Sequence, residues 1–129
     1  MEKVLCIKPM GCCERSDDLE WSARLVRPDG SEFRLWYRVH VQWRDRVAAD
    51  RADAFLVPCI FYAMQNNWNL QVQGEVTTGL VRRLYEFQQV WACWRPDVYH
   101  LIQIQAKETP PGPARKTGLI TLFSGGLDS

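Results

Sequence analysis

Two stretches on either side of a turn place hydrophobic side chains at every second position, with mostly polar side chains between them. Residues 19–26 place Leu, Trp, Ala and Leu at every second position, and residues 33–39 do the same with Phe, Leu, Tyr and Val. The triplet Pro28-Asp29-Gly30 lies between them, where proline presets φ and glycine tolerates a positive φ. A period of two on both sides of a turn predicts a β-hairpin with one buried face. Trp36 falls on the opposite face and marks a candidate second contact surface.

The pattern becomes helical between residues 48 and 64, where aromatic and aliphatic side chains form a broad apolar surface. Asp53 is the candidate N-cap, because its side chain can accept a hydrogen bond from the first turn. Pro58 lacks an N–H donor, so it is expected either to begin the main part of the helix or to kink it. The pair Asn66-Asn67 is expected to end the element.

A second helix is predicted after residues 69–74, which have the pattern of a short strand. Either Thr77 or Thr78 is expected to cap this helix, and Pro96 to close it. Its apolar stripe has helical spacing and consists of Leu80, Leu84, Phe87, Trp91 and Trp94. The polar remainder of the helix surface consists of Arg82, Arg83, Glu86, Gln88 and Gln89.

Two further stretches predict strands. Residues 3–7, Lys-Val-Leu-Cys-Ile, predict a short strand that Pro9 and Gly11 end, so residues 11–13 are assigned to a loop. Residues 99–107 alternate again and predict a strand. The inward candidates of this strand are Leu101 or Ile102, and Ile104.

These elements predict an α+β domain over residues 1–108, in which a β-hairpin and short strands pack with two helices. Residues 109–117 contain three prolines and a glycine, a composition typical of a semi-rigid linker. Residues 118–123 form a short apolar run, expected to be the first buried parallel strand of a separate α/β nucleotide-binding domain. Such a domain needs roughly a hundred or more residues, so residues 118–129 are expected to be its beginning, in a longer protein.

The charge balance gives no sign of a strongly electrostatic partner. The formal net charge is +1, and basic side chains are interspersed with acidic ones, as in Arg44-Asp45-Arg46. Proteins that bind nucleic acids usually show a basic patch or stripe, so the composition does not favour strong RNA binding. The N-terminus lacks the long apolar stretch of a signal peptide, and no run approaches transmembrane length. A cytoplasmic location is therefore expected.

The five cysteines are interpreted as thiols without a metal. Cys12 and Cys13 are adjacent, and with Cys6 upstream they do not match the paired spacing of zinc sites. Cys59 and Cys93 lie in apolar helical patterns and are expected to be core thiols. An odd number of cysteines without a secretory signal is typical of a reducing compartment.

Two histidines and three tryptophans stand apart from the main patterns. His40 and His100 have no nucleophile or carboxylate partner visible in the sequence, so both are expected to be structural or exposed. Trp36, Trp43 and Trp68 lie off the clearest apolar stripes. They belong either to the domain's own packing or to a surface that binds a protein partner. No catalytic residue and no metal ligand is assigned.

The last six residues carry the strongest chemical signal. Ser124-Gly125-Gly126-Leu127-Asp128-Ser129 directly follows the apolar run of residues 118–123. Adjacent glycines allow backbone N–H groups to approach phosphate oxygens closely, and both serine hydroxyls can donate to the same oxygens. A helix that begins here would direct its positive N-terminus at the anion. Asp128 cannot attract a phosphate by charge and is expected to orient the loop or to support a Mg²⁺ ion.

This strand and motif resemble the PP-loop of the ATP pyrophosphatase superfamily, whose pattern is SGGxDS at the end of a first β-strand. The resemblance is confined to residues 119–129. It implies that the loop holds the β- and γ-phosphates of ATP, with Mg²⁺ as the accompanying ion. Family members adenylate a substrate oxygen with release of pyrophosphate, and a nitrogen or sulfur nucleophile then displaces AMP. The implied ATP-binding residues are Ser124, Gly125, Gly126, Leu127, Asp128 and Ser129.

The residues ahead of the loop narrow the choice within the superfamily. Residue 2 is Glu, whereas asparagine synthetases have a catalytic Cys there, and no Cys-His-Glu glutaminase of the GMP synthetase kind is recognisable. Leu122-Phe123 followed by the motif most resembles 7-cyano-7-deazaguanine synthases, although those place the loop close to their N-terminus. An N-terminally extended relative is therefore expected, with a small-molecule or nucleobase acceptor and with any zinc-binding cysteines beyond residue 129.

Two alternatives remain open at this point. One is a tRNA-thiolating PP-loop enzyme with an RNA-binding front domain, and the other is a protein-interaction module with a degenerate loop.

Overall fold

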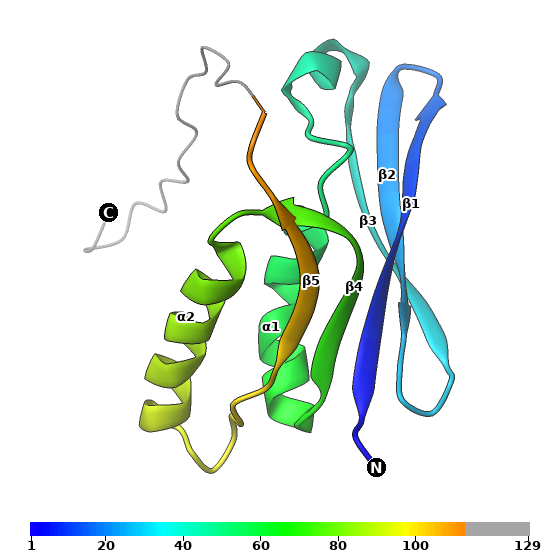
Figure 1. The fold of residues 1–129 in the computed structure, drawn as a ribbon. Coiled ribbons are helices and arrows are strands. Elements are labelled where there is room, and N and C mark those ends of the chain that lie inside the picture. Colours follow the sequence, from blue (N-terminus) through cyan, green and yellow to red (C-terminus); the bar gives the residue numbers. More distant parts are fainter. Residues whose placement is uncertain (113–129) are drawn as a thin grey trace, which may run out of the picture.

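The computed structural model describes residues 1–112, which form a five-stranded mixed sheet, two α-helices and one short 3-10 helix (Figure 1). This arrangement confirms the predicted α+β class for the N-terminal domain. The elements in chain order are β1 Val4–Arg15, β2 Asp18–Val26, β3 Glu32–His40, η1 Val41–Arg46, α1 Asp53–Asn66, β4 Asn69–Thr77, α2 Leu80–Trp94 and β5 Ile104–Thr109.

The strand order across the sheet is β3-β2-β1-β4-β5. The first three strands are antiparallel neighbours, whereas β4 is parallel to β1 and β5 is parallel to β4. Parallel neighbours require crossover connections, and α1 and α2 are the helices of these crossovers (Figure 1). The carboxyl ends of β1, β4 and β5 consequently lie at the same end of the sheet.

One face of the sheet packs on the helices and the other is polar. Leu5 and Ile7 of β1 and Leu70 of β4 are buried in a single core cluster with Phe55 and Leu56 of α1. The residues of β2 and β3 that point away from this core bear mostly charged side chains. Along β3 these exposed residues alternate with half-buried ones on the core side. We call this polar side of β1, β2 and β3 the open face.

The predicted hairpin of β2 and β3 is confirmed. Its register runs from Asp18 opposite His40 to Val26 opposite Glu32. In the turn, Gly30 has φ of 86°, and the Asp29 carboxylate accepts a hydrogen bond of 2.8 Å from the Ser31 N–H.

The prediction of a loop at residues 11–13 is wrong, because β1 continues to Arg15 and pairs with β2 throughout. The register shifts between Pro9 and Gly11, and Gly11 has φ of 87°. This irregularity is a β-bulge, which absorbs one extra residue and keeps the ladder going. Pairing with β2, which the local sequence cannot reveal, outweighs the strand-breaking tendency of Pro9 and Gly11.

The two predicted helix caps are also wrong, although both helices are present. Asp53 is the first residue of α1, and its carboxylate accepts a 2.9 Å hydrogen bond from Thr77 N–H rather than from its own helix. Thr77 belongs to β4, and Gly79, with φ of 89°, precedes α2 without a capping side chain. The predicted end of the first helix is confirmed, since Asn67 adopts φ of 54° directly after it.

Pro58 lies inside α1 rather than at its start. It has no N–H to donate to the carbonyl of Ala54, one turn earlier. The Tyr37 hydroxyl of β3 donates a 2.6 Å hydrogen bond to that carbonyl instead. A side chain from the sheet therefore satisfies the backbone acceptor that the proline leaves open.

Gln88 of α2, assigned to the polar side of the helix, is completely buried. Its Oε1 accepts a 2.8 Å hydrogen bond from the Ile102 N–H, in the segment that leads to β5. That segment is irregular, and β5 begins only at Ile104, five residues later than predicted. Of the inward candidates, Ile102 is buried and Leu101 is exposed. Trp94, placed on the apolar stripe, is 67% exposed.

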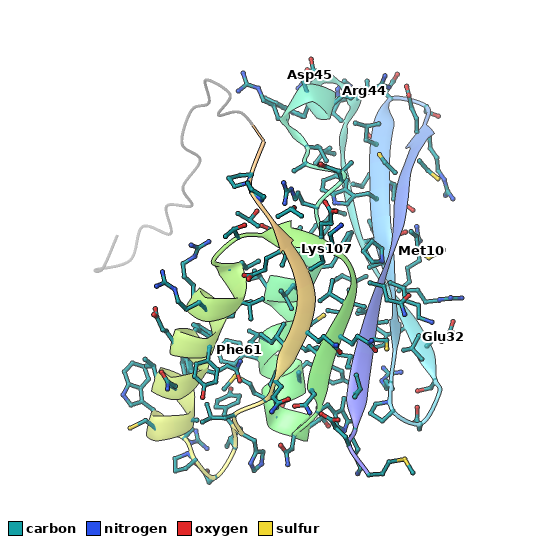
Figure 2. All side chains as sticks on the ribbon, viewed as in Figure 1. Met10, Glu32, Arg44, Asp45, Phe61 and Lys107 are labelled. Atoms are coloured by element: carbon teal, nitrogen blue, oxygen red, sulfur yellow. The ribbon has the colours of Figure 1, made fainter. Side chains whose placement is uncertain are left out.

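An aromatic cluster joins the two helices. Phe61 of α1, labelled in Figure 2, has ring centroids of Phe87 and Trp91 of α2 at 5.1 Å and that of Tyr99 at 5.2 Å. Edge and tilted contacts of this kind are the preferred geometries of aromatic pairs. They hold α2 against α1 on the helical side of the sheet.

We predict that Tyr37→Phe lowers the free energy of unfolding by about 1 kcal/mol, the usual contribution of one hydrogen bond. The same change in a Pro58→Ala background should cost much less, because the alanine supplies the missing N–H. Urea denaturation of the four proteins of this cycle measures the coupling. Tyr85→Phe, at an exposed position of α2, is the matched control. Equal losses in both backgrounds would show that the hydroxyl does not compensate for the proline.

Candidate functional site

The six predicted ATP-binding residues, Ser124, Gly125, Gly126, Leu127, Asp128 and Ser129, lie outside the described residues. The same holds for the predicted strand over residues 118–123 and for most of the predicted linker. Within residues 1–112, the two cavities of about 550 and 460 Å³ have the linings richest in charged side chains. One lies at the carboxyl end of β4 and β5, and the other lies over the open face.

The carboxyl end of the sheet is shaped by the limited pairing of β1 with β4. These strands pair only over residues 4–7 and 69–72. Pro9 then approaches Gly74 so closely that an added Cβ there would lie 3.2 Å from the proline ring. Beyond this point Arg51 bridges to Glu75, and the Ala52 N–H donates a 2.8 Å hydrogen bond to the Glu75 carbonyl. The segment ahead of α1 thus takes the place beside β4 that β1 leaves.

Arg51 connects this segment to the end of β5. Its guanidinium donates to the carbonyl of Thr109 at 3.0 Å, to the Thr109 hydroxyl and to the carbonyl of Pro110. The Thr109 carbonyl also accepts a 3.0 Å hydrogen bond from the Thr78 N–H. We call this set of contacts the exit clamp, because it holds the last residues of β5 and the first residue after it. The clamp holds the first two residues beyond the predicted domain boundary at 108.

An ion pair supports the clamp from the neighbouring strand position. Lys107 Nζ lies 3.0 Å from Glu75 Oε1, and Glu75 Oε2 accepts a 3.3 Å hydrogen bond from the Thr109 hydroxyl. The hydrogen bond and the positive charge of Lys107 lower the pKa of Glu75. Glu75 therefore stays ionised and adds a fixed negative charge beside the Arg51 guanidinium.

A cavity of about 550 Å³ adjoins the clamp. This volume falls within the usual range of small-molecule sites, and the carboxyl ends of parallel strands are the common place for such sites. The lining mixes cations, carboxylates, a hydroxyl and apolar groups and consists of Trp21, Arg46, Val47, Ala48, Asp50, Arg51, Asp53, Ala54, Thr77, Pro111 and Gly112. The cavity is suited to a small polar ligand held by charge and hydrogen bonds.

The open face is organised around a buried carboxylate. Glu20 of β2 is only 3% exposed, and its two oxygens accept hydrogen bonds from Arg34 and, at 2.8 Å, from Arg38. These hydrogen bonds lower the pKa of Glu20 from 4.5 to about 2, and the bond from Arg38 contributes more than the bond from Arg34. The arginines remain about half exposed, so their other N–H groups face solvent.

A second cavity, of about 460 Å³, lies over the open face at the bulge of β1. Its lining is rich in arginine and consists of Met10, Gly11, Cys13, Arg15, Glu20, Ser22, Arg24, Glu32, Phe33 and Arg34. Figure 2 shows Met10 and Glu32 on the side of the sheet away from Phe61 and the helices. This surface is chemically suited to anions rather than to apolar ligands.

The predictions for the cysteines are only partly correct. Cys59 is buried, and desolvation raises its pKa to about 11, as expected of an unreactive core thiol. Cys93 is exposed on α2, so its assignment to the core is wrong. Cys12 and Cys13 are exposed on β1. Within the described part of the chain, no three His, Cys, Asp or Glu side chains come together in a way that could hold a metal ion.

The histidines and tryptophans also have defined places. His40 precedes η1, and its Nδ1 accepts a 3.2 Å hydrogen bond from the Gln42 N–H, which is a structural role. His100 is exposed. Trp36 and Trp43 are about half exposed. Trp68 packs edge-on against Tyr62 at 5.4 Å and belongs to the periphery of the core.

Sequence reasoning missed the exit clamp and the buried Glu20. Arg51 carries no local signal, because its partners lie almost sixty residues later in the chain. Glu20 and Arg38 do carry one, since the predicted hairpin places them opposite each other on its polar face. A cross-strand pairing of the hairpin's charged positions would have found this ion pair.

Comparison of the chain with protein families, with curated proteins and with solved structures finds no match. Among the helices of residues 1–112, none has the length and apolar character needed to cross a membrane.

We predict that Arg51→Met lowers the free energy of unfolding by about 1–2 kcal/mol, because it removes charge-assisted hydrogen bonds. It should also speed hydrogen exchange of the Thr78 amide, which bonds to Thr109. Arg82→Met, at an exposed position of α2, is the matched control for loss of the same side chain. Unchanged exchange at Thr78 would mean that Arg51 does not hold the end of β5.

We predict that Glu20 makes stability depend on pH in the acid range. Its folded pKa lies below the ordinary value, so the ionised form stabilises the fold above pH 4.5. That stabilisation is lost as the pH falls from 4.5 to about 2. Glu20→Gln should lower stability at neutral pH and flatten the pH dependence in this window. Denaturant titrations across the window, with exposed Glu86→Gln as control, test this, and an equal slope for wild type and Glu20→Gln would refute it.

Proposed function

We propose that this chain belongs to an ATP-dependent PP-loop enzyme that adenylates a substrate and releases pyrophosphate. The observation that carries the proposal is the motif Ser124–Ser129 directly after the apolar run of residues 118–123. Residues 1–108 serve as the accessory front domain of this enzyme. The substrate is a small molecule or a nucleobase, as in the 7-cyano-7-deazaguanine synthases that the motif resembles.

The proposed chemistry has two steps. An oxygen of the substrate carboxylate attacks the α-phosphorus of ATP. The bond from that phosphorus to the oxygen that bridges the α- and β-phosphates breaks, and pyrophosphate leaves with that oxygen. An amine or thiol nucleophile then attacks the activated carbon, and AMP leaves with the oxygen that it had gained. Backbone N–H groups of Gly125 and Gly126 and the hydroxyls of Ser124 and Ser129 bind the departing phosphates. Mg²⁺ neutralises the triphosphate in the first step, with Asp128 as its candidate support.

The described domain is compatible with this role. The exit clamp fixes Thr109 and Pro110, so the chain leaves the front domain from a defined point, immediately before the residues that lead to the motif. The cavity of about 550 Å³ lies at the same point and is large enough for a small-molecule acceptor. The cytoplasm is the proposed compartment, because its reducing conditions keep thiols such as Cys12 and Cys13 free.

The test is acceptor-dependent release of pyrophosphate from ATP by the complete gene product, with candidate carboxylates as acceptors. Ser124→Ala should lower the rate about a hundredfold, as removal of one group that stabilises a developing anion does. Asp128→Ala should also lower the rate, because the loop or its Mg²⁺ ion loses the support of the carboxylate. Ser16→Ala and Asp45→Ala, at exposed positions of the front domain, are the matched controls.

Two results would contradict the proposal. One is release of orthophosphate in place of pyrophosphate, and the other is no binding of nucleotide at all. Either would make the loop degenerate and the front domain the functional part, as in a protein-interaction module.

A further inference from the structure

Three cations stand in one row across the open face. Lys8 of β1 is directly opposite Arg24 of β2, and Arg24 is directly opposite Arg34 of β3. Like charges in opposite positions of neighbouring strands destabilise a sheet. A row of three is therefore a feature that folding alone does not favour, and an anion bound along it would remove the repulsion.

The carboxylates on this face neutralise the row only in part. Glu20 is shared between Arg34 and Arg38, and the nearest carboxylate to Arg24 is that of Glu32, at 3.7 Å. This distance is longer than a hydrogen bond. Lys8 has no ion pair among the described residues. The row consequently keeps an excess of positive charge and unused N–H donors.

An exposed aromatic side chain lies beside the row. Trp36 stands between Arg34 and Arg38 on β3, with its side chain on the open face and 48% exposed. Alternate residues of a strand are about 7 Å apart, so a cation flanks the indole on each side. The Arg38 guanidinium lies 5.0 Å from the indole centroid. One face of the ring is thus supported, and the side chain offers a platform on which a planar group can stack.

A serine hydroxyl adds a polar contact at the floor of this surface. Ser22 is opposite Trp36 and only 8% exposed, and it lines the cavity of about 460 Å³. Among residues 1–112 its hydroxyl has no hydrogen-bond partner, and it is not closed off from solvent. A buried hydroxyl that opens into an arginine-lined cavity is available to a ligand.

We propose that the open face binds single-stranded nucleic acid. Phosphates lie along Lys8, Arg24 and Arg34, and a base stacks on Trp36. A cationic groove combined with an aromatic platform is the usual means of binding single strands without sequence preference. An acidic peptide would use the cations and leave the platform empty, which is why nucleic acid is the better match. The inference rests on the front domain alone and does not depend on the proposed PP-loop chemistry.

The test is fluorescence anisotropy of the 129-residue chain with labelled single-stranded RNA and DNA of about 12 nucleotides, over a series of salt concentrations. Three phosphate contacts predict a slope of about −2 for log K against log salt. Lys8→Gln with Arg24→Gln should weaken binding and reduce the slope by about 1.4. The same double variant should unfold at an equal or higher temperature, because the repulsion in the row is gone.

Trp36→Ala should weaken binding about 5- to 100-fold while leaving the salt slope unchanged, since it removes stacking and no charge. Trp43→Ala is the matched control, because Trp43 is equally exposed, at 49%, but lies in η1. Arg82→Gln with Arg83→Gln on α2 is the control for loss of two charges.

Three outcomes would overturn the proposal. The first is no binding at low salt by the folded wild-type chain. The second is an equal loss of affinity in the control variants, which would indicate nonspecific attraction to charge. The third is competition by polyglutamate as effective as that by unlabelled oligonucleotide, which would identify the partner as an acidic protein segment.

Discussion

The parallel seam between β1 and β4 is short, and most of the architecture follows from that. Pairing stops after Ile7 because Pro9 has no N–H to continue it, and Gly74 is the residue that lets the two chains pass closely. The second half of β1 is then committed to β2 alone. Arg51 and Ala52 then bind the edge of β4 that β1 leaves free. Their position there brings the exit clamp and its cavity to the carboxyl end of the sheet.

The parts of the fold that sequence predicts are those whose determinants are local. The hairpin of β2 and β3 depends on alternation and on a turn with Gly30, and both are legible in one stretch of chain. The extent of β1 is not, because its residues 11–13 become a strand only through their pairing with β2. Gln88 illustrates the same limit within a helix. Its amide is polar by composition, yet it is buried because Ile102 supplies a backbone donor from another element.

The candidate sites divide in the same way. The proposed phosphate-binding motif is recognisable from six consecutive residues, whereas the exit clamp joins positions 51 and 109 and leaves no local pattern in the sequence. Net charge is equally uninformative here. The value of +1 is a sum over the whole chain, and it gives no sign of the alignment of Lys8 with Arg24 and Arg34 across three strands. Arg24 and Arg34, two of its three members, follow from the hairpin register, but Lys8 joins them only once β1 is known to pair with β2.

The exit clamp has a mechanical consequence. A force applied to the chain beyond Pro110 acts first on the hydrogen bonds from Arg51 to Thr109 and Pro110, and only then on those between β4 and β5. Part of such a force is therefore carried by the segment that precedes α1, which protects β5 from peeling off the sheet. Residues 109 and 110, the first two of the predicted linker, are thus held by the sheet, so the chain is stiffer at this point than its composition suggests.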